Sequence, residues 1–212
     1  MARERALTPA RSGLAPGAVP RCAGAAMLGE GICPLEAMRD FHHRQRQTCA
    51  DLEAIAGDPL PDRSLAMRLL VELCHDMRLH HADEDCDLFP LLRRRARPED
   101  EIETLLARLE AEHRQSAEAL PSMLRTLAAM ATGRVARGAR RRALAEHARA
   151  HRRHMIIENA IVLPLACMRL TTRDRRGLML RMRTRRAAPP GLSTACRKAL
   201  GAVLLHLPEE ML

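Results

Sequence analysis

Four histidines in the sequence are placed so that they could bind metal together. Each lies on the apolar stripe of a predicted helix, with hydrophobic residues three or four positions away. Two of the four are followed by a glutamate four residues later. Because four residues make slightly more than one helical turn, such a histidine and glutamate leave the same face of the helix. The six residues are His42, His80, Glu84, His113, His154 and Glu158.

Together these side chains offer four imidazoles and two carboxylates in a pseudo-two-fold arrangement. A single histidine on an apolar stripe is ordinarily a hydrogen-bonded core residue, and Glu84 alone would fit a surface acid. Two carboxylates buried without partners are costly, however, and no Lys or Arg lies on these stripes to neutralise them. Two nitrogens per metal, with two bridging carboxylates, suit iron, or manganese as a substitute. The pattern therefore predicts a pair of metal ions.

The elements that must position these residues are predicted to be all-α. Hydrophobic residues make up 47% of the chain, yet it holds only two Phe and neither Trp nor Tyr, and helix formers dominate. Ser64 is expected to cap the second helix, Thr171 or Thr172 the fifth, and Pro90 and Pro121 to bend their helices. Short loops favour an up-down-up-down four-helix bundle with an additional short C-terminal helix. The bundle helices are expected at about residues 34–56, 64–88, 106–127 and 139–170, and the fifth from about Asp174.

Three regions follow from composition and charge. Residues 1–30 are rich in Pro, Gly and Ala without periodicity and are predicted to be disordered. Residues 31–170 form the bundle, and residues 171–212 a basic helix and tail. The net charge of +9 comes entirely from residues 169–198, which carry ten basic groups and one acid. That segment suits an acidic partner or anionic lipid, but the preferred interpretation is a solvated helix covering one end of the bundle. Nucleic acid is not favoured, because no aromatic residues interleave with the cations.

The remaining features point to a cytoplasmic protein. Seven scattered cysteines contain no C-x-x-C pair and form no disulfide framework. No apolar run approaches the roughly 18 residues of a membrane span, so no transmembrane segment is expected. The N-terminus has arginines but no apolar core of signal-peptide type.

Several stretches resemble the motifs of the hemerythrin-like (HHE cation-binding) domain family, bacterial type. They are "HHRQRQTC", "HHADEDCDLFPLL", "LEAEHRQS" and "HMIIENAIVLP", and the resemblance covers about residues 35–186. It implies a four-helix bundle with a non-haem di-iron centre, two Fe ions bridged by oxo and carboxylate groups. It also implies that the six residues above are the ligands, with Glu84 and Glu158 bridging.

The sequence departs from the oxygen-carrying hemerythrins at Ala117, where those proteins have an extra histidine one turn after the third-helix ligand. With two HxxxE motifs it looks closer to the iron–sulfur repair members. Those members often carry a vicinal cysteine pair, whereas Cys22 and Cys33 stand alone here. His147 or His151 could supply an additional ligand. His43 and His81 are expected at the surface or just outside the ligand set.

The function expected from this resemblance is a di-iron protein that binds or senses O2 or NO, or that handles iron. Its chemistry would be ligand binding at an open iron with electron transfer, rather than acid–base turnover. One alternative is a di-iron enzyme, of peroxidase type or of iron–sulfur repair, using the same ligands. Another is an interaction protein that acts through its basic C-terminal segment. Without Tyr or Trp, enzymes that need a tyrosyl or tryptophanyl radical are excluded.

Overall fold

The computed structural model describes residues 33–60, 62–188 and 191–206. Within these residues the chain forms helices and no strand, which confirms the all-α prediction. The residues predicted to form a disordered extension, 1–30, lie outside the described ranges. In chain order the elements are α1 (Pro34–Gly57), α2 (Arg63–Asp83), the π-helical η2 (Glu84–Leu88), α3 (Phe89–Arg95), the 3-10 turn η3 (Pro98–Asp100), α4 (Glu103–Ala131), α5 (Gly138–Ile157), the π-helical η4 (Glu158–Val162), α6 (Leu163–Arg169), α7 (Thr172–Ala187) and α8 (Thr194–Leu204).

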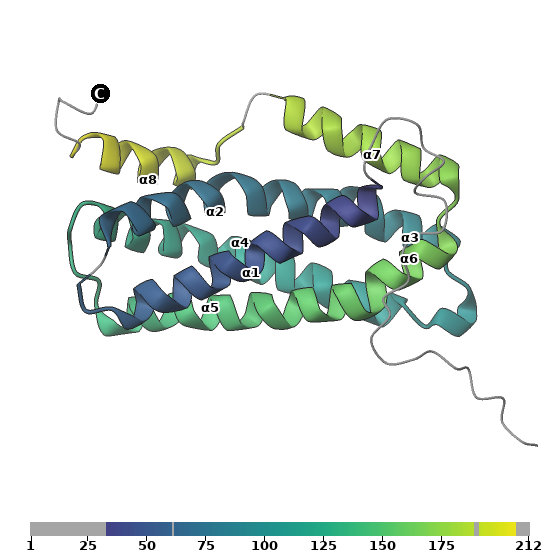
Figure 1. Ribbon diagram of the computed structural model, residues 1–212, viewed down its shortest axis with the longest axis horizontal. Helices are drawn as coiled ribbons and strands as arrows, with labels where there is room; N and C mark the ends of the chain where they lie inside the picture. The colour runs from purple at the N-terminus through teal and green to yellow at the C-terminus, as the bar shows by residue number, and fades with distance from the viewer. Residues whose placement is uncertain (1–32, 61, 189–190, 207–212) are drawn as a thin grey trace, which may run out of the picture.

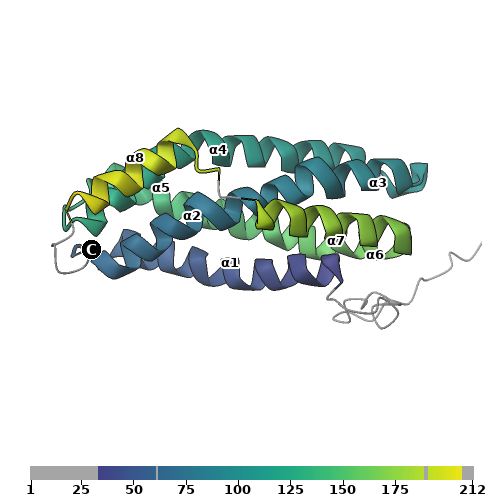
Figure 2. The same cartoon turned by 90° about the horizontal axis from the view of Figure 1, so that it is seen from above.

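Four long helices form the predicted bundle. They are α1, the continuous helix α2–η2–α3, α4, and the continuous helix α5–η4–α6. Each packs against the next in sequence, and α5 closes the ring against α1. Figure 1 shows that they alternate in direction along the long axis of the molecule, and Figure 2 shows the same arrangement from above. No helix in the described part of the chain is long and apolar enough to cross a bilayer.

The apolar core consists of two clusters with a polar band between them. Along α1, Leu35 and Met38 belong to one cluster and Leu52 and Ile55 to the other, with His42 between them. Because adjacent helices are antiparallel, the clusters occur in reverse order in the next helix. The other interruptions are His80 and Glu84 between Met77 and Leu88, His113 between Leu109 and Met123, and His154 and Glu158 between Ala148 and Val162. The residues singled out in the sequence therefore share one level of the bundle.

The helix boundaries follow from local capping. Pro34 occupies the first turn of α1, as expected from its position in the sequence. The cap predicted for α2 is wrong: Asp62, rather than Ser64, accepts hydrogen bonds from the backbone amides of Ser64 and Leu65. Ser64 therefore lies in the first turn. At α7 the cap is Thr171, which forms a reciprocal capping box with Asp174.

The basic segment is docked along the bundle as two helices, α7 and α8. Figure 1 shows them following one another along the same long side. Three arginines of α7 pair with buried acids of the second bundle helix: Arg185 with both Asp83 and Asp87, Arg186 with Asp83 at 2.6 Å, and Arg181 with Asp87. These contacts use part of the positive charge to neutralise acids inside the protein. The division of the chain at residue 170 stays a prediction.

Acid should weaken the docking of α7. Asp174 at its start accepts two hydrogen bonds from Arg95 of α3, at 2.9 and 3.1 Å. The hydrogen bonds from Arg95 lower the pKa of Asp174 to about 2. A carboxylate with a lowered pKa stabilises the fold above its unfolded value of about 3.9, and this stabilisation is lost as pH falls toward 2. In thermal unfolding between pH 5 and pH 2, Asp174→Asn should lose less stability than the wild type. Parallel curves for the two proteins would contradict this.

Candidate metal centre

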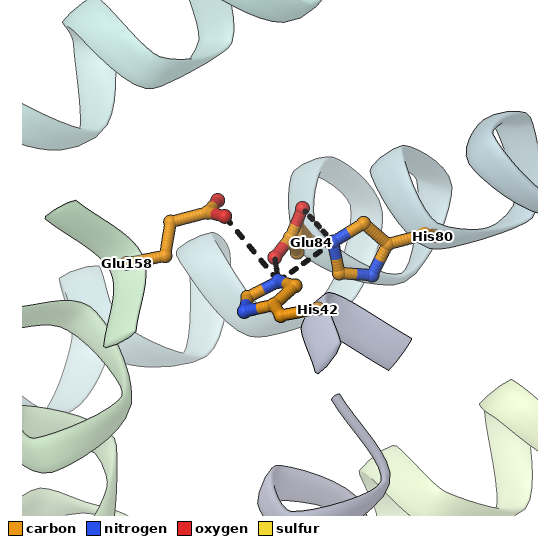
Figure 3. A group of neighbouring side chains, drawn as sticks. All are labelled: His42, His80, Glu84 and Glu158. Carbon is orange, nitrogen blue, oxygen red and sulfur yellow. Dashed lines mark hydrogen bonds and ion pairs between the residues drawn. The ribbon is translucent and has the colours of Figure 1, made fainter. Parts of the chain in front are cut away.

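All six residues predicted as ligands converge at the middle of the bundle. Each of the four long helices contributes at least one of them, and none is more than 4% exposed. Their ligand atoms form two groups within which all atoms lie within 4.8 Å of one another. Glu84 and Glu158 belong to both groups. The first group adds His42 and His80, shown in Figure 3, and the second adds His113 and His154.

Each group contains one pair of facing imidazoles. The Nε2 atoms of His42 and His80 lie 2.9 Å apart, and those of His113 and His154 lie 2.8 Å apart. Two ligand atoms at neighbouring corners of an octahedron, each roughly 2.1 Å from an ion, lie about 3 Å apart. The observed separations therefore match two ligands of a single six-coordinate ion, once in each group.

The two carboxylates lie between the imidazole pairs. The Nε2 atom of His80 is 3.2 Å from an oxygen of Glu84, and that of His113 is 3.6 Å from the same oxygen. Glu158 faces the Nε2 atom of His42 at 3.4 Å and that of His154 at 3.0 Å. Glu84 also lies 3.7 Å from the Nε2 atom of His42. Each glutamate thus contacts at least one histidine of each pair, so its carboxylate could serve both groups.

The glutamate oxygens provide a test of whether metal suits this site. Glu84 and Glu158 are fully buried, and none of their four carboxylate oxygens has a hydrogen-bond partner among the described residues. Buried carboxylate oxygens are normally hydrogen-bonded or paired with a cation. Four carboxylate oxygens without a hydrogen bond, facing two pairs of imidazole nitrogens, form a donor set that fits two divalent transition-metal ions.

The two carboxylates of the centre differ in their tendency to ionise. Burial raises the pKa of Glu84 well above its usual value, and the neighbouring Glu158 carboxylate raises it further. Burial also opposes ionisation of Glu158, but the contact with His154 outweighs it and lowers the pKa of Glu158 to about 2. The pair therefore holds one proton without metal. Burial lowers the pKa values of His42 and His80, so both imidazoles are neutral and ready to act as ligands.

Local helix geometry sets the position of both glutamates. Each is the first residue of a π-helical segment, η2 or η4, and each is followed six residues later by a proline, Pro90 or Pro164. A proline in an α-helix lacks an N–H and clashes with the carbonyl four residues earlier. The wider π turn accommodates it, since the residue before each proline bonds to the glutamate carbonyl five residues back. Pro90, expected to bend or loosen the second helix, lies within a continuous helix.

Three of the four candidate ligand histidines are oriented by hydrogen bonds at their Nδ1 atoms. The Nδ1 atom of His113 lies 2.7 Å from Asp85, and that of His154 lies 2.8 Å from Glu112. The Nδ1 atom of His42 lies 3.1 Å from the side-chain oxygen of Asn159. Sequence reasoning missed these partners, although each is the immediate neighbour of one of the six residues. The imidazoles of one group therefore face carboxylates, which strengthens their donation to metal, whereas His42 faces a neutral amide.

The other histidines lie outside the two groups. His43 and His206 are exposed, and the side chain of His75 is 42% exposed. His81 stacks on His113 with ring centroids 4.0 Å apart, so it lies just outside the ligand set. His147 and His151, the candidates for an additional ligand, contribute no atom to either group in the described part of the chain. Ala117, one turn after His113, is exposed and offers no ligand atom.

The comparison with family models agrees with this geometry. Residues 33–166 match the model described as the hemerythrin HHE cation-binding domain. The chain belongs to this family. The match ends within α6, so the HHE domain covers the four long helices that carry the six buried residues, while α7 and α8 follow it. No match was found among the curated proteins or among the solved structures.

The metal-free HHE domain should become more stable when Glu84 is replaced by glutamine. An acid whose folded pKa is raised stabilises the fold below its unfolded value, about 4.3, and loses that contribution as pH rises. Wild-type protein treated with chelator should therefore lose stability between pH 5 and pH 8. Glu84→Gln should lose less and unfold at a higher temperature at pH 8. Glu118→Gln, on the exposed face of α4, serves as the matched control and should follow the wild type. A wild-type pH profile for Glu84→Gln would contradict the prediction.

The outer hydrogen bonds predict unequal affinity at the two groups. Glu112→Gln removes the carboxylate that accepts the hydrogen bond from His154. It should lower the affinity for one metal ion by about 10- to 100-fold and leave the affinity for the other unchanged. The measurement is a metal titration in competition with a chelator, again with Glu118→Gln as control. Equal weakening of both ions, or of neither, would contradict the asymmetry.

Proposed function

We propose that the protein binds two iron ions through the six converging residues and uses them to bind a small ligand such as O2 or NO. The observation that carries this proposal is the pair of buried glutamates shared by two groups of histidines. None of the four carboxylate oxygens has a hydrogen-bond partner among the described residues. Membership of the hemerythrin HHE family supports it.

The residues of each group define the protein ligands available to one ion. Each group offers two imidazole nitrogens and one oxygen from each of two carboxylates. Four protein ligands leave a six-coordinate ion with open positions, and bound iron would supply a redox-active Lewis acid for a small ligand there. The protein's own part is to hold the ligands in place through Asp85, Glu112 and Asn159, and to exclude bulk water with the apolar clusters on either side.

Gas binding is favoured over the two alternatives by specific features. The iron–sulfur repair members carry a vicinal cysteine pair, whereas Cys33 is buried in an apolar cluster here. The interaction alternative needs free cations on the basic segment, but three arginines of α7 are paired with Asp83 and Asp87. A peroxidase-type enzyme would use the same six ligands. Only a measurement of catalytic peroxide consumption distinguishes it from a gas-binding protein.

The decisive experiment is metal analysis of the protein after anaerobic loading with ferrous iron, combined with visible spectroscopy. The wild type should hold one iron for each of the two groups. It should show a reversible spectral change on exposure to O2 or NO. Because the chain has no Trp or Tyr, its own near-ultraviolet background is low. His80→Ala and Glu158→Gln should lose iron and the spectral change, while His75→Ala, altered at an exposed histidine, should keep both.

The possible results are distinct. No iron uptake by the wild type, or undiminished uptake by Glu158→Gln, would overturn the di-iron proposal. Catalytic consumption of peroxide that depends on His80, without reversible gas binding, would replace the gas-binding proposal with the enzyme.

A further inference from the structure

A pocket of about 440 Å³ opens beside the second group of the metal centre. Its lining comes from α4 and α5, with one residue from α2. His113 and His154 form part of the wall, but His42 and His80 do not. The pocket also holds three histidines that the proposed centre does not use: His81, His147 and His151.

These three histidines share an unusual property. The Nε2 atom of each is buried and has no hydrogen-bond partner among the described residues. His151 is only 6% exposed, so its free nitrogen lies well inside the protein. Buried polar atoms without partners are rare in folded proteins and call for an explanation. Three of them in one pocket leave three imidazole nitrogens available to bind a ligand there.

The histidine rings form a continuous series from the outside to the centre. His147, His151 and His154 lie on one face of α5, and successive ring centroids are 6.1 Å apart. Exposure falls along the series, since His147 is half-buried, His151 is 6% exposed and His154 is 4% exposed. His81 flanks the inner end, 6.1 Å from the ring of His151.

These imidazoles are in the form that binds metal. Burial lowers the pKa of His147 to about 4, and burial together with the charge of His147 lowers the pKa of His151 to about 3. Both rings are therefore neutral at physiological pH, with a lone pair on one nitrogen. A neutral diatomic gas gains little from such nitrogens, whereas a divalent transition-metal ion binds them well.

The spacing suits temporary rather than permanent binding. An ion roughly 2.1 Å from each of two imidazole nitrogens separates the ring centroids by about 5 to 6 Å. Successive rings in the series can thus share one ion after small side-chain rotations. Among the described residues, however, the only sets of three or more converging ligand atoms are the two at the centre. Passage through a protein requires sites that bind well enough for entry and weakly enough for release.

We propose that this pocket is the entry route for metal, in which His147 and then His151 hold an incoming divalent ion and pass it to His154 and His113. His81 supplies a further nitrogen at the inner end. The inference rests on the proposed function, in which that ion is ferrous iron. The group that contains His113 and His154, which adjoins the pocket, would then be filled with metal before the other group.

The test measures the rate of metal loading separately from the final metal content. Full-length protein freed of metal is mixed anaerobically with ferrous iron, and uptake is followed by rapid-quench metal analysis. The double variant His147→Gln/His151→Gln keeps polar side chains in the pocket but removes both imidazoles. It should load several-fold more slowly than the wild type and reach the same final content. His75→Gln, at an exposed histidine outside the pocket, should load at the wild-type rate.

The single variant His147→Gln guards against misfolding, because this half-buried residue is the easiest of the three to replace. It should also slow loading. Wild-type loading rates in both variants would overturn the entry route. A lower final content in either variant would also overturn it, since the histidine would then be a permanent ligand. A wild type that takes up no iron would defeat the proposed function itself, which is a separate result.

Discussion

Two carboxylates buried at the centre of a helical bundle are the constraint on which the rest of this structure depends. Glu84 and Glu158 are fully buried, and their oxygens face imidazole nitrogens and each other. Such groups are tolerated only when protons or cations compensate them. The facing histidines, the polar band that divides the apolar core, and the π-helical segments that begin at each glutamate are all arranged around this need. The centre therefore lowers the stability of the metal-free fold in return for a strong set of metal ligands.

The acidic residues from Asp83 to Asp87 point in different directions and make different contacts. Glu84 points into the bundle, and Asp85 accepts from the outer nitrogen of His113. Asp83 and Asp87 face the other way and pair with arginines of α7. The basic C-terminal segment is thereby paired with the outer face of the helix whose inner face carries Glu84.

The centre is symmetric in its ligands but not in its surroundings. The group containing His113 and His154 is backed by carboxylates and adjoins the histidine-lined pocket. In the other group, His42 bonds to a neutral amide and His80 stacks on Phe41 with ring centroids 4.2 Å apart. A pair of ions in such a centre would differ in affinity and in access. That difference suits a site in which one position is loaded first and the other is enclosed.

The sequence by itself determined the helices and the six converging residues, because both follow from spacing along a single helix. Apolar stripes and the HxxxE repeats are local patterns, and four in-register stripes leave few ways to assemble a bundle. Only the tertiary structure decided the partners that come from different helices. Residues far apart in the chain meet in the hydrogen bond from His154 to Glu112, in the pairing of α7 with Asp83, and in the pocket lined by His81 and His147. These contacts depend on how the helices are rotated relative to one another. The spacing of residues within one helix does not determine that rotation.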